Sequence, residues 1–357
     1  MAETYTSNLH IEKASSSRLQ DVNFKDLAFG VTFTDHMFMC DFVDGQWQQP
    51  KIVPYGPMPM EPSARVFHYG QAVFEGMKAY KDEQGDVFLF RPEENFKRIN
   101  KSCARLAMPE FPEDYFFEGL NTLLNLDKDW IQSGVGNSLY VRPFAIATEP
   151  IISAAPSETY RFMIICSPVS PYYKGKVKVV IAEHFSRSAD GGVGFAKAAG
   201  NYAAQFYPTK LAQQKGFQQV IWTDSSTHSY LEEAGTMNVF FRINDTLITA
   251  PTSDRILDGV TRKSVIQLAK DNNINVEVRP IKVQEIVDAA NNGSLKEIFG
   301  SGTAAVISEI SAFEYQDKIY ELDDLGTTGY AAKMKKEMLH IQHNLAEDKH
   351  NWRYPVK

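Results

Sequence analysis

Hydrophobic and polar residues alternate along much of the first hundred positions, which is the pattern of half-buried strands. Alternation predicts a strand over His36–Val43, a turn at Asp44-Gly45 and a partner or irregular return over Gln46–Val53. A second hairpin is predicted from Glu75–Lys81 and Asp86–Arg91, because turn-forming residues separate these two apolar runs. The beginning of the chain is therefore expected to build a sheet.

Prolines mark the beginnings of two helices that follow. Apolar residues recur at helical spacing over Pro92–Leu106 and again over Pro112–Ser133, and a proline suits the first position of a helix because its missing N–H would be unpaired there anyway. Two further strands are predicted at Ser138–Thr148 and Tyr160–Ser167.

Two prolines and a glycine interrupt regular structure over Ser167–Gly175, and we expect the chain to cross there between two domains. A strand at Lys176–Glu183 then opens a region where short apolar strands alternate with helices, near 201–215, 261–271, 283–291 and 327–347. At 357 residues the chain is too long for one ordinary core. The predicted organisation is a loosely ordered leader over 1–28, a smaller N-terminal α/β domain over 29–168, an interdomain loop over 169–176 and a larger C-terminal α/β domain over 177–357.

The composition narrows the class of protein only slightly. The chain is 43% hydrophobic and 23% charged, as globular enzymes are, which excludes a disordered protein. Its formal net charge of −7 comes without a basic stripe, so nucleic-acid binding is set aside. No run approaches the roughly 20 apolar residues of a membrane-spanning helix, so no membrane association is expected.

Cysteine usage points to a reducing compartment. Cys40, Cys103 and Cys166 are far apart and odd in number, without the spacing of a disulfide framework or a metal knuckle. The polar, Ser-rich start has no apolar core of signal-peptide length. We therefore expect a cytoplasmic protein without a bound metal.

Candidate chemistry begins at Lys197, which four glycines bracket in the stretch from Gly191 to Tyr202. Such a loop lets the backbone approach a ligand closely. Alone, a lysine in a glycine-rich loop is usually solvated and inert. Neither a dinucleotide nor a nucleoside triphosphate loop motif occurs, so any bound phosphate is held in another way.

Several motifs in a fixed order give this lysine its context. They are His68-Tyr-Gly-Gln-Ala-Val-Phe-Glu-Gly-Met-Lys-Ala79, Leu89-Phe-Arg-Pro-Glu-Glu-Asn-Phe-Lys-Arg98, Leu139-Tyr-Val-Arg-Pro143, Tyr230-Leu-Glu-Glu-Ala-Gly-Thr-Met-Asn238, Gly259-Val-Thr-Arg262 and Phe299-Gly-Ser-Gly-Thr-Ala304. From about Phe29 to its C-terminus the chain resembles the branched-chain amino acid aminotransferases, which are pyridoxal 5'-phosphate (PLP) enzymes of fold type IV. The resemblance implies a mixed α+β and α/β fold of two domains with mixed sheets and the cofactor site at the domain interface.

The resemblance also implies a role for each cofactor-binding residue. Lys197 would be the Schiff-base lysine and the proton shuttle. Glu233 would face the pyridine nitrogen and keep it protonated, so that the ring withdraws electrons. Tyr202 would donate a hydrogen bond to the 3' oxygen. The phosphate would be held by the remaining cofactor-binding residues, Arg98, Val260, Thr261 and Thr303, with Thr236 beside them.

The substrate side of the implied site is mostly aromatic. The family's side-chain pocket corresponds here to Phe29, Tyr69, Phe74, Tyr140, Tyr172 and Thr236, and the substrate α-carboxylate would be bound by backbone N–H groups of Thr303 and Ala304. One methylene in an apolar pocket is worth only about 1–3 kcal/mol, so leucine, isoleucine and valine are all expected substrates. Arg142, with the Tyr69 and Tyr140 hydroxyls, is the candidate partner for the second carboxylate of glutamate.

The predicted activity is a reversible ping-pong transamination between L-leucine, L-isoleucine or L-valine and 2-oxoglutarate, catalysed by a homodimer in which a loop of the partner subunit completes each site. Two other fold type IV enzymes, D-amino acid aminotransferase and aminodeoxychorismate lyase, share the lysine, the glutamate and the phosphate-binding residues. A non-catalytic protein that kept the fold is a third alternative. It is disfavoured because Lys197, Glu233, Tyr202 and Arg98 are all present.

Overall fold

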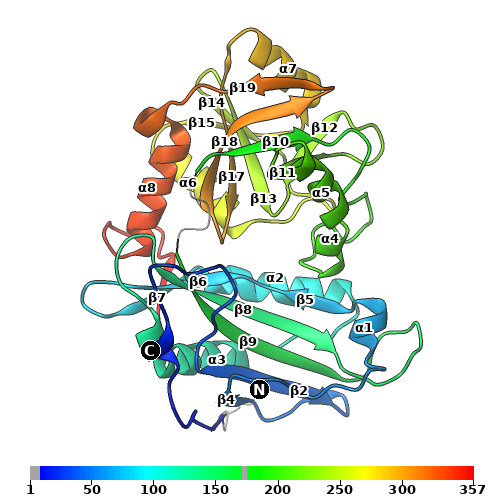
Figure 1. The fold of residues 1–357 in the computed structure, drawn as a ribbon, viewed down its shortest axis with the longest axis vertical. Coiled ribbons are helices and arrows are strands. Elements are labelled where there is room, and N and C mark those ends of the chain that lie inside the picture. Colours follow the sequence, from blue (N-terminus) through cyan, green and yellow to red (C-terminus); the bar gives the residue numbers. More distant parts are fainter. Residues whose placement is uncertain (1–8, 171–174) are drawn as a thin grey trace, which may run out of the picture. The chain divides into compact units, whose positions relative to one another are not determined.

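The computed structural model describes residues 9–170 and 175–357, which form two compact units with one ten-stranded sheet each (Figure 1). Of the described residues, unit 1 contains 9–170, 196–200 and 339–357. Unit 2 contains 175–195 and 201–338. The mixed α/β content of both units agrees with the predicted fold class.

The sheet of unit 1 has the strand order β1-β4-β2-β9-β8-β6-β7-β20, with β3 paired to β2 and β5 paired to β8. Its longest pairing joins β8 and β9, which are antiparallel over ten residues each. The elements are β1 (His10–Ile11), η1 (Leu19–Asp21), β2 (His36–Val43), β3 (Gln46–Trp47), β4 (Lys51–Pro54), α1 (Arg65–Tyr69), β5 (Ala72–Phe74), β6 (Met77–Lys81), β7 (Val87–Phe90), α2 (Pro92–Arg105), α3 (Glu113–Leu126), η2 (Lys128–Trp130), β8 (Ser138–Ala147), β9 (Tyr160–Val169) and β20 (Arg353–Pro355).

The core of unit 1 lies between α3 and the sheet. Leu120 and Leu123 of α3 are fully buried, as helical spacing of apolar residues predicts. Phe111 and Phe162 stack with ring centroids 3.7 Å apart. Gly119 has no side chain because a Cβ there would lie 2.5 Å from the Phe38 ring, so the glycine permits close packing of α3 on β2.

The sheet of unit 2 has the order β15-β14-β13-β17-β18-β10-β11-β12-β16, with β19 paired to β18. Helix α5 contacts β11, α6 contacts β15 and β17, and α7 contacts β16 and β17. The elements are β10 (Val177–Ile181), α4 (Gly200–Ala203), α5 (Phe206–Gln214), β11 (Gln219–Thr223), β12 (Tyr230–Ala234), β13 (Met237–Ile243), β14 (Thr246–Thr249), α6 (Val260–Asp271), β15 (Asn275–Val278), β16 (Ile281–Lys282), α7 (Val283–Asn291), β17 (Leu295–Gly302), β18 (Val306–Tyr315), β19 (Lys318–Glu321), η3 (Gly326–Thr328) and α8 (Tyr330–Gln342).

The predicted strands and helices occur, with ends that differ where side chains compete for the backbone. The helix predicted to reach Ser133 ends at Leu126. Asp127, which follows it, instead accepts hydrogen bonds from the His36 backbone N–H at 3.1 Å and pairs with the His36 ring at 2.6 Å. This long-range pairing is invisible in local periodicity.

The leader is a second difference, because its described part is held against unit 1. Strand β1 pairs in parallel with β4. The Ser17 hydroxyl and the Arg18 backbone N–H both donate to the buried Asp35 carboxylate, at 2.6 and 2.9 Å. The expectation of loose order is therefore wrong for residues 9–18.

The end of the chain belongs to unit 1 and not to the C-terminal domain that was expected to run to residue 357. Strand β20 adds to the edge of the first sheet by pairing antiparallel with β7, as seen near the C label of Figure 1. Residues 196–200, with Lys197, also belong to unit 1. The strand propensity of three residues is too weak to reveal such a return from the sequence.

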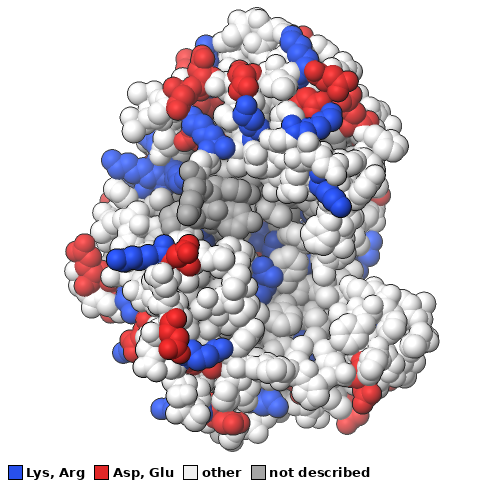
Figure 2. Space-filling model, in the orientation of Figure 1, with Lys and Arg blue, Asp and Glu red and all other residues white. Residues whose placement is uncertain are grey.

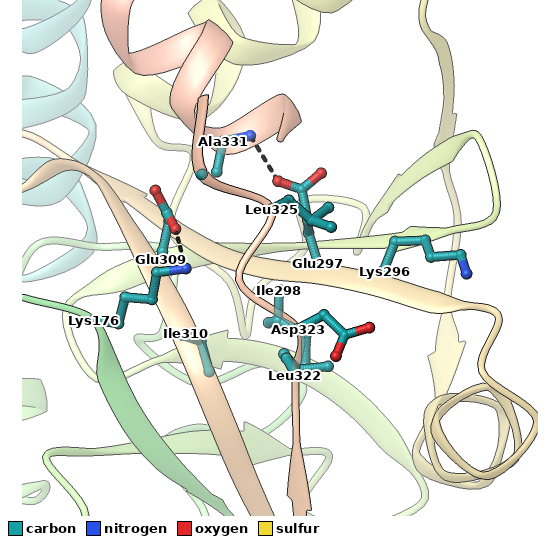
Figure 3. A pocket seen from close by; sticks show the side chains of 11 residues that line it. Lys176, Lys296, Glu297, Ile298, Glu309, Ile310, Leu322, Asp323, Leu325 and Ala331 are labelled. Carbon is teal, nitrogen blue, oxygen red and sulfur yellow. Dashed lines mark hydrogen bonds and ion pairs between the residues drawn. The ribbon is translucent and has the colours of Figure 1, made fainter. Parts of the chain in front are cut away.

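Helix α8 begins at a buried carboxylate, shown in the hollow of Figure 3. Glu297 accepts hydrogen bonds from the backbone N–H groups of Tyr330 and Ala331, at 2.8 and 3.1 Å, and pairs with Arg242 at 3.0 Å. A carboxylate is stabilising there because the first N–H groups of a helix lack partners and carry partial positive charge. Lys176 and Glu309 pair across the same hollow at 2.9 Å.

Two further searches concern the described residues only. No helix among them is long and apolar enough to cross a membrane. Among the same residues there is no group of three or more His, Cys, Asp or Glu side chains arranged to hold a metal ion. On the face shown in Figure 2, acidic and basic side chains are interspersed.

Candidate active site

Lys197 is fixed to the sheet of unit 1 through its backbone. Its carbonyl accepts a hydrogen bond from the Phe74 N–H at 3.1 Å, and its own N–H donates to the Ser102 hydroxyl at 2.9 Å. Its neighbour Ala198 forms an antiparallel bridge with Val73. The glycine-rich loop therefore delivers the lysine to a strand-like attachment.

Ser102 connects the lysine to the predicted phosphate ligand. Its fully buried hydroxyl accepts from Lys197 and donates to the Arg98 carbonyl at 2.9 Å, one helical turn earlier in α2. Residues four apart lie on the same face of a helix, so α2 fixes the backbones of both functional residues at once. The sequence analysis did not identify Ser102.

Arg98 forms a bidentate ion pair with Glu75. Its Nε and Nη2 lie 2.6 and 2.8 Å from the two carboxylate oxygens, and Asn95 donates to the same carboxylate at 2.7 Å. The Glu75 residue is 0% exposed. Burial alone would raise the pKa of this carboxyl, but the positive charges of Arg98 and Lys197 and the Asn95 hydrogen bond hold the pKa below its ordinary value. Glu75 is a residue of the quoted motif to which the sequence analysis gave no role.

Four of the predicted substrate residues and Lys197 lie in one cluster in unit 1. The Lys197 ammonium nitrogen lies 4.7 Å from the centre of the Phe74 ring, and the guanidinium carbon of Arg142 lies 4.5 Å from the same centre. Arg142 donates to the Tyr140 hydroxyl at 3.0 Å, and Tyr140 meets Phe29 edge to face at 5.1 Å. The cluster is aromatic, with one cation directed along it.

Two features show that this cluster is specifically shaped. Gly76 has no side chain because a Cβ there would lie 2.1 Å from the Tyr140 hydroxyl. The Nε atom of Arg142 is buried and has no hydrogen-bond partner among the described residues. An orphaned donor of this kind is costly unless a ligand or water pairs with it.

The other predicted pocket residues are placed less tightly. Tyr69 ends α1, is 43% exposed and contacts His68. The structure places it in no hydrogen bond with Arg142 or Tyr140. Tyr172 lies outside the described residues.

In unit 2, Glu233 is buried and paired with an arginine that the sequence analysis missed. The Nη1 atom of Arg187 lies 2.7 Å from Glu233 Oε1, and the two side chains are 3% and 5% exposed. The other oxygen, Oε2, accepts hydrogen bonds from the Asn238 side chain and the Leu257 N–H, both at 3.3 Å. Arg187 lies outside every quoted motif, and only a structure reveals its role.

The hairpin of β12 and β13 brings the remaining residues of unit 2 toward Glu233. Glu233 pairs with Asn238 across this hairpin, and Asn238 pairs with Ser301 on β17. Thr236 is exposed in the turn of the hairpin. Because β17 ends at Gly302, Thr303 and Ala304 lie in the short turn that leads to β18.

The N-terminus of α6 supplies the predicted phosphate-binding backbone. Val260 and Thr261 are its first two residues, both buried, and Gly259 precedes them. Asn238 connects this point to Glu233, because its side chain also donates to the Leu257 carbonyl at 2.9 Å. A helix start of this kind attracts an anion through unpaired N–H groups and the helix dipole. Tyr202, within α4, is half-buried.

Comparison with known proteins identifies the class. The family model described as "Amino-transferase class IV" matches residues 72–313, more than half of the chain. A "Branched-chain-amino-acid aminotransferase 2" of Bacillus subtilis is 45% identical over 330 residues, which cover 91% of each chain. A "Probable branched-chain-amino-acid aminotransferase" of Staphylococcus aureus is 44% identical over 342 residues, covering 94% of this chain and 95% of the relative. The chain therefore belongs to the branched-chain amino acid aminotransferases of the class IV family.

Solved structures agree on the fold. A crystal structure of a branched-chain aminotransferase from Thermoproteus uzoniensis with norvaline has a TM-score of 0.74 at 22% identity, covering 90% of this chain and 100% of that one. A bacterial-type relative from T.th., a branched-chain amino acid aminotransferase complexed with N-(5'-phosphopyridoxyl)-L-glutamate, has a TM-score of 0.72 at 21% identity, covering 89% and 98%. The predicted fold type IV architecture is confirmed.

Class IV aminotransferases use PLP, and the donor set of this chain suits that cofactor. In unit 2 a buried carboxylate, Glu233, lies near the N-terminus of a twelve-residue helix, α6. The Ser301 hydroxyl is buried there without a partner among the described residues. Unit 1 adds a lysine beside a guanidinium group. A negatively charged phosphate and a basic ring nitrogen are complementary to these groups.

We predict that Glu75→Gln lowers the free energy of unfolding of the apoprotein by about 3 kcal/mol or more, because it leaves the Arg98 charge buried without its counter-charge. Since the pKa of Glu75 is lowered in the folded protein, its stabilising effect is complete above the ordinary carboxyl pKa and is lost as the pH falls through the lowered value. The difference between the two proteins is therefore expected to narrow in acid. Denaturant titrations at neutral and acidic pH measure both effects.

Glu93→Gln is the matched control, because Glu93 lies exposed in the first turn of the same helix, α2. It is expected to change stability by no more than about 1 kcal/mol. Equal losses in the two variants at neutral pH would show that the buried pair has no special role.

Proposed function

We propose that this protein is a branched-chain amino acid transaminase, which reversibly transfers the amino group between L-leucine, L-isoleucine or L-valine and 2-oxoglutarate, giving the branched 2-oxo acid and L-glutamate by a ping-pong mechanism. The observation that carries the proposal is the position of Phe74 between Lys197 and Arg142, at 4.7 and 4.5 Å. An amine nucleophile, an aromatic wall and a buried cation thus lie side by side.

The cofactor residues are assigned from this chain's own geometry and the family pattern. PLP, when bound, supplies a carbonyl carbon for the amine and a ring that accepts electrons from the substrate. Lys197 holds the cofactor and moves the proton at Cα with its Nζ atom. Glu233 faces the ring nitrogen, and Tyr202 donates to the 3' oxygen. The phosphate is bound by Arg98, the backbone of Val260 and Thr261, and Thr303, with Thr236 beside it.

The backbone attachment of Lys197 supports its assigned role. A hydrogen bond on each side of the residue holds its main chain, so that movement is confined to the side chain. A proton shuttle must alternate between two atoms without losing its position, and a fixed main chain reduces the entropy lost at each transfer.

The substrate assignment follows from the aromatic cluster. Phe29, Phe74 and Tyr140 form an apolar surface on which branched aliphatic groups lose contact with water, and we extend this pocket with Tyr69, Tyr172 and Thr236. Arg142 pairs with the second carboxylate of glutamate or 2-oxoglutarate. Backbone N–H groups of Thr303 and Ala304 bind the α-carboxylate shared by all the substrates.

The two rival activities within the fold are less well supported. Relatives that share 42–45% identity with this chain over most of its length carry the branched-chain name. Incubating the protein with L-leucine, D-alanine and aminodeoxychorismate, each with its own co-substrate, separates the three activities directly.

We predict that Lys197→Ala abolishes covalent attachment of PLP and lowers transamination of L-leucine by a factor of at least about 10³, because the substitution removes both the nucleophile and the proton shuttle. Borohydride reduction of the wild-type holoenzyme, followed by peptide mass spectrometry, is expected to locate the pyridoxyl group on Lys197. Lys210→Ala, at an exposed lysine of α5, is the control and keeps both properties. A pyridoxyl group found on another lysine would refute the assignment.

We predict that Arg142→Met separates the two amino donors. The rate constant kcat/KM for glutamate is expected to fall at least about thirtyfold, because an unpaired carboxylate in a desolvated site costs about 2 kcal/mol or more. That for L-leucine is expected to stay within about fivefold, since leucine has no second carboxylate. Single-turnover kinetics of each half-reaction measure the two values. The charge-conserving Arg142→Lys is expected to retain part of the glutamate activity, and equal losses for both donors would contradict the assignment.

We further infer that the active species is a homodimer in which a loop of the partner subunit completes each site, as the family pattern implies. Light scattering is expected to give about twice the chain mass of 40.3 kDa at enzyme concentrations that support activity. Full activity from a monomer would overturn this inference. The cytoplasmic location stays a prediction, with which three buried free cysteines agree.

A further inference from the structure

Arg187 occupies an unusual position for an arginine outside the recognised motifs. Its side chain is 3% exposed, and one nitrogen, Nη1, serves three acceptors. They are the Glu233 carboxylate at 2.7 Å, the Gly194 carbonyl at 3.1 Å and the Arg255 carbonyl at 2.9 Å. A buried cation with one carboxylate and two carbonyls is held by a complete set of acceptors, which fixes its place.

The carboxylate that Arg187 pairs with has a buried neighbour of the same charge. Glu232 and Glu233 follow one another on β12, and both are nearly inaccessible to water. Their side chains point to opposite faces of the strand, and each has its own arginine: Glu232 pairs with Arg255 and Glu233 with Arg187. Two adjacent buried carboxylates repel each other, so both stay ionised only with strong compensation.

The compensation is unequal. Burial raises the pKa of Glu232 to about 7, although Arg255 opposes the rise, and the charge on Glu233 contributes to it. Arg255 is itself partly exposed and is shared with Asp190. Arg187 is fully buried and is paired with no carboxylate other than Glu233 among the described residues. The buried ion pair therefore favours the ionised form of Glu233 over that of its neighbour.

Arg187 also holds the loop that precedes the cofactor lysine. Gly194, whose carbonyl it binds, stands three positions before Lys197. A Cβ at Gly194 would lie 2.6 Å from the Arg255 carbonyl and 2.7 Å from that of Asp254, so the loop is pressed against this backbone. One side chain thus connects the loop, the backbone at Arg255 and the carboxylate.

We propose that Arg187 is a positioning residue that keeps the Glu233 carboxylate ionised and oriented for the ring nitrogen of PLP. The inference rests on the proposed function of Glu233. A neutral Glu233 would share its own proton with the ring nitrogen and leave the ring uncharged, whereas an ionised Glu233 stabilises the protonated ring. The electron-withdrawing power of the ring therefore depends on a guanidinium group that does not touch the cofactor.

The test combines a variant with a cofactor that lacks the nitrogen in question. Wild type and Arg187→Gln are each reconstituted with PLP and with its 1-deaza analogue, in which a C–H group replaces the ring nitrogen. With PLP, the variant is expected to lose about 10²-fold in kcat with little change in KM. With the analogue, the two proteins are expected to agree within about threefold, because the group through which Arg187 acts is missing.

A second measurement does not depend on turnover. The ring nitrogen of ¹⁵N-labelled PLP is expected to resonate as a protonated pyridine in the wild-type holoenzyme and to move toward the neutral position in Arg187→Gln. Arg187→Lys, which keeps a charge but not the planar fork, is expected to lie between them and covers the case in which the glutamine variant does not fold. Arg255→Gln is the matched control, since it removes an arginine from the neighbouring carboxylate, and it is expected to keep the wild-type resonance.

An equal loss of kcat with both cofactors, together with an unchanged ¹⁵N resonance, would show that Arg187 is only structural and would overturn the proposal. A failure of the proposed function is distinguishable, because the wild type would then neither bind PLP covalently nor transaminate L-leucine.

Discussion

The cost of burying charge governs the arrangement of this protein. A charged group taken out of water is tolerated only with a partner and a full set of hydrogen bonds. Unit 1 meets this condition with Arg98 and Glu75, and unit 2 meets it with Glu233 and Arg187. In both cases the group assigned to the cofactor is one member of the pair, and its partner is buried behind it. A permanent partner lets each group keep its charge and its orientation before any ligand arrives.

The two pairs differ in what stabilises them further. Glu75 receives an amide from Asn95 on the same helix as Arg98, so α2 supplies both partners. Glu233 instead receives groups from separate segments, with Asn238 on the adjacent strand and Leu257 in the connection to α6. The first arrangement is local and the second gathers distant parts of the chain. We infer that the second depends more strongly on the complete fold of its unit.

Much of the fold could be predicted from local pattern, and the rest could not for identifiable reasons. Strand β2 and helix α7 have the predicted bounds, because their apolar periodicity and flanking residues agree. The end of α3 and the docking of the leader depend on hydrogen bonds to Asp127 and Asp35 from distant residues. In the site, Lys197, Phe74 and Arg142 were identified by motif and do lie together, whereas Arg187 and Ser102 act through contacts that no spacing rule encodes.

Unit 1 is assembled from three stretches of chain, and this has a consequence for its biogenesis. Most of its sheet is built by the first half of the sequence, but its edge strand β20 follows the whole of unit 2 along the chain. A ribosome releases β20 only after it has made every residue of unit 2, so the edge of β7 stays open until then. The second half of the protein therefore has the opportunity to fold before the first half is complete, the reverse of the usual N-terminal-first order.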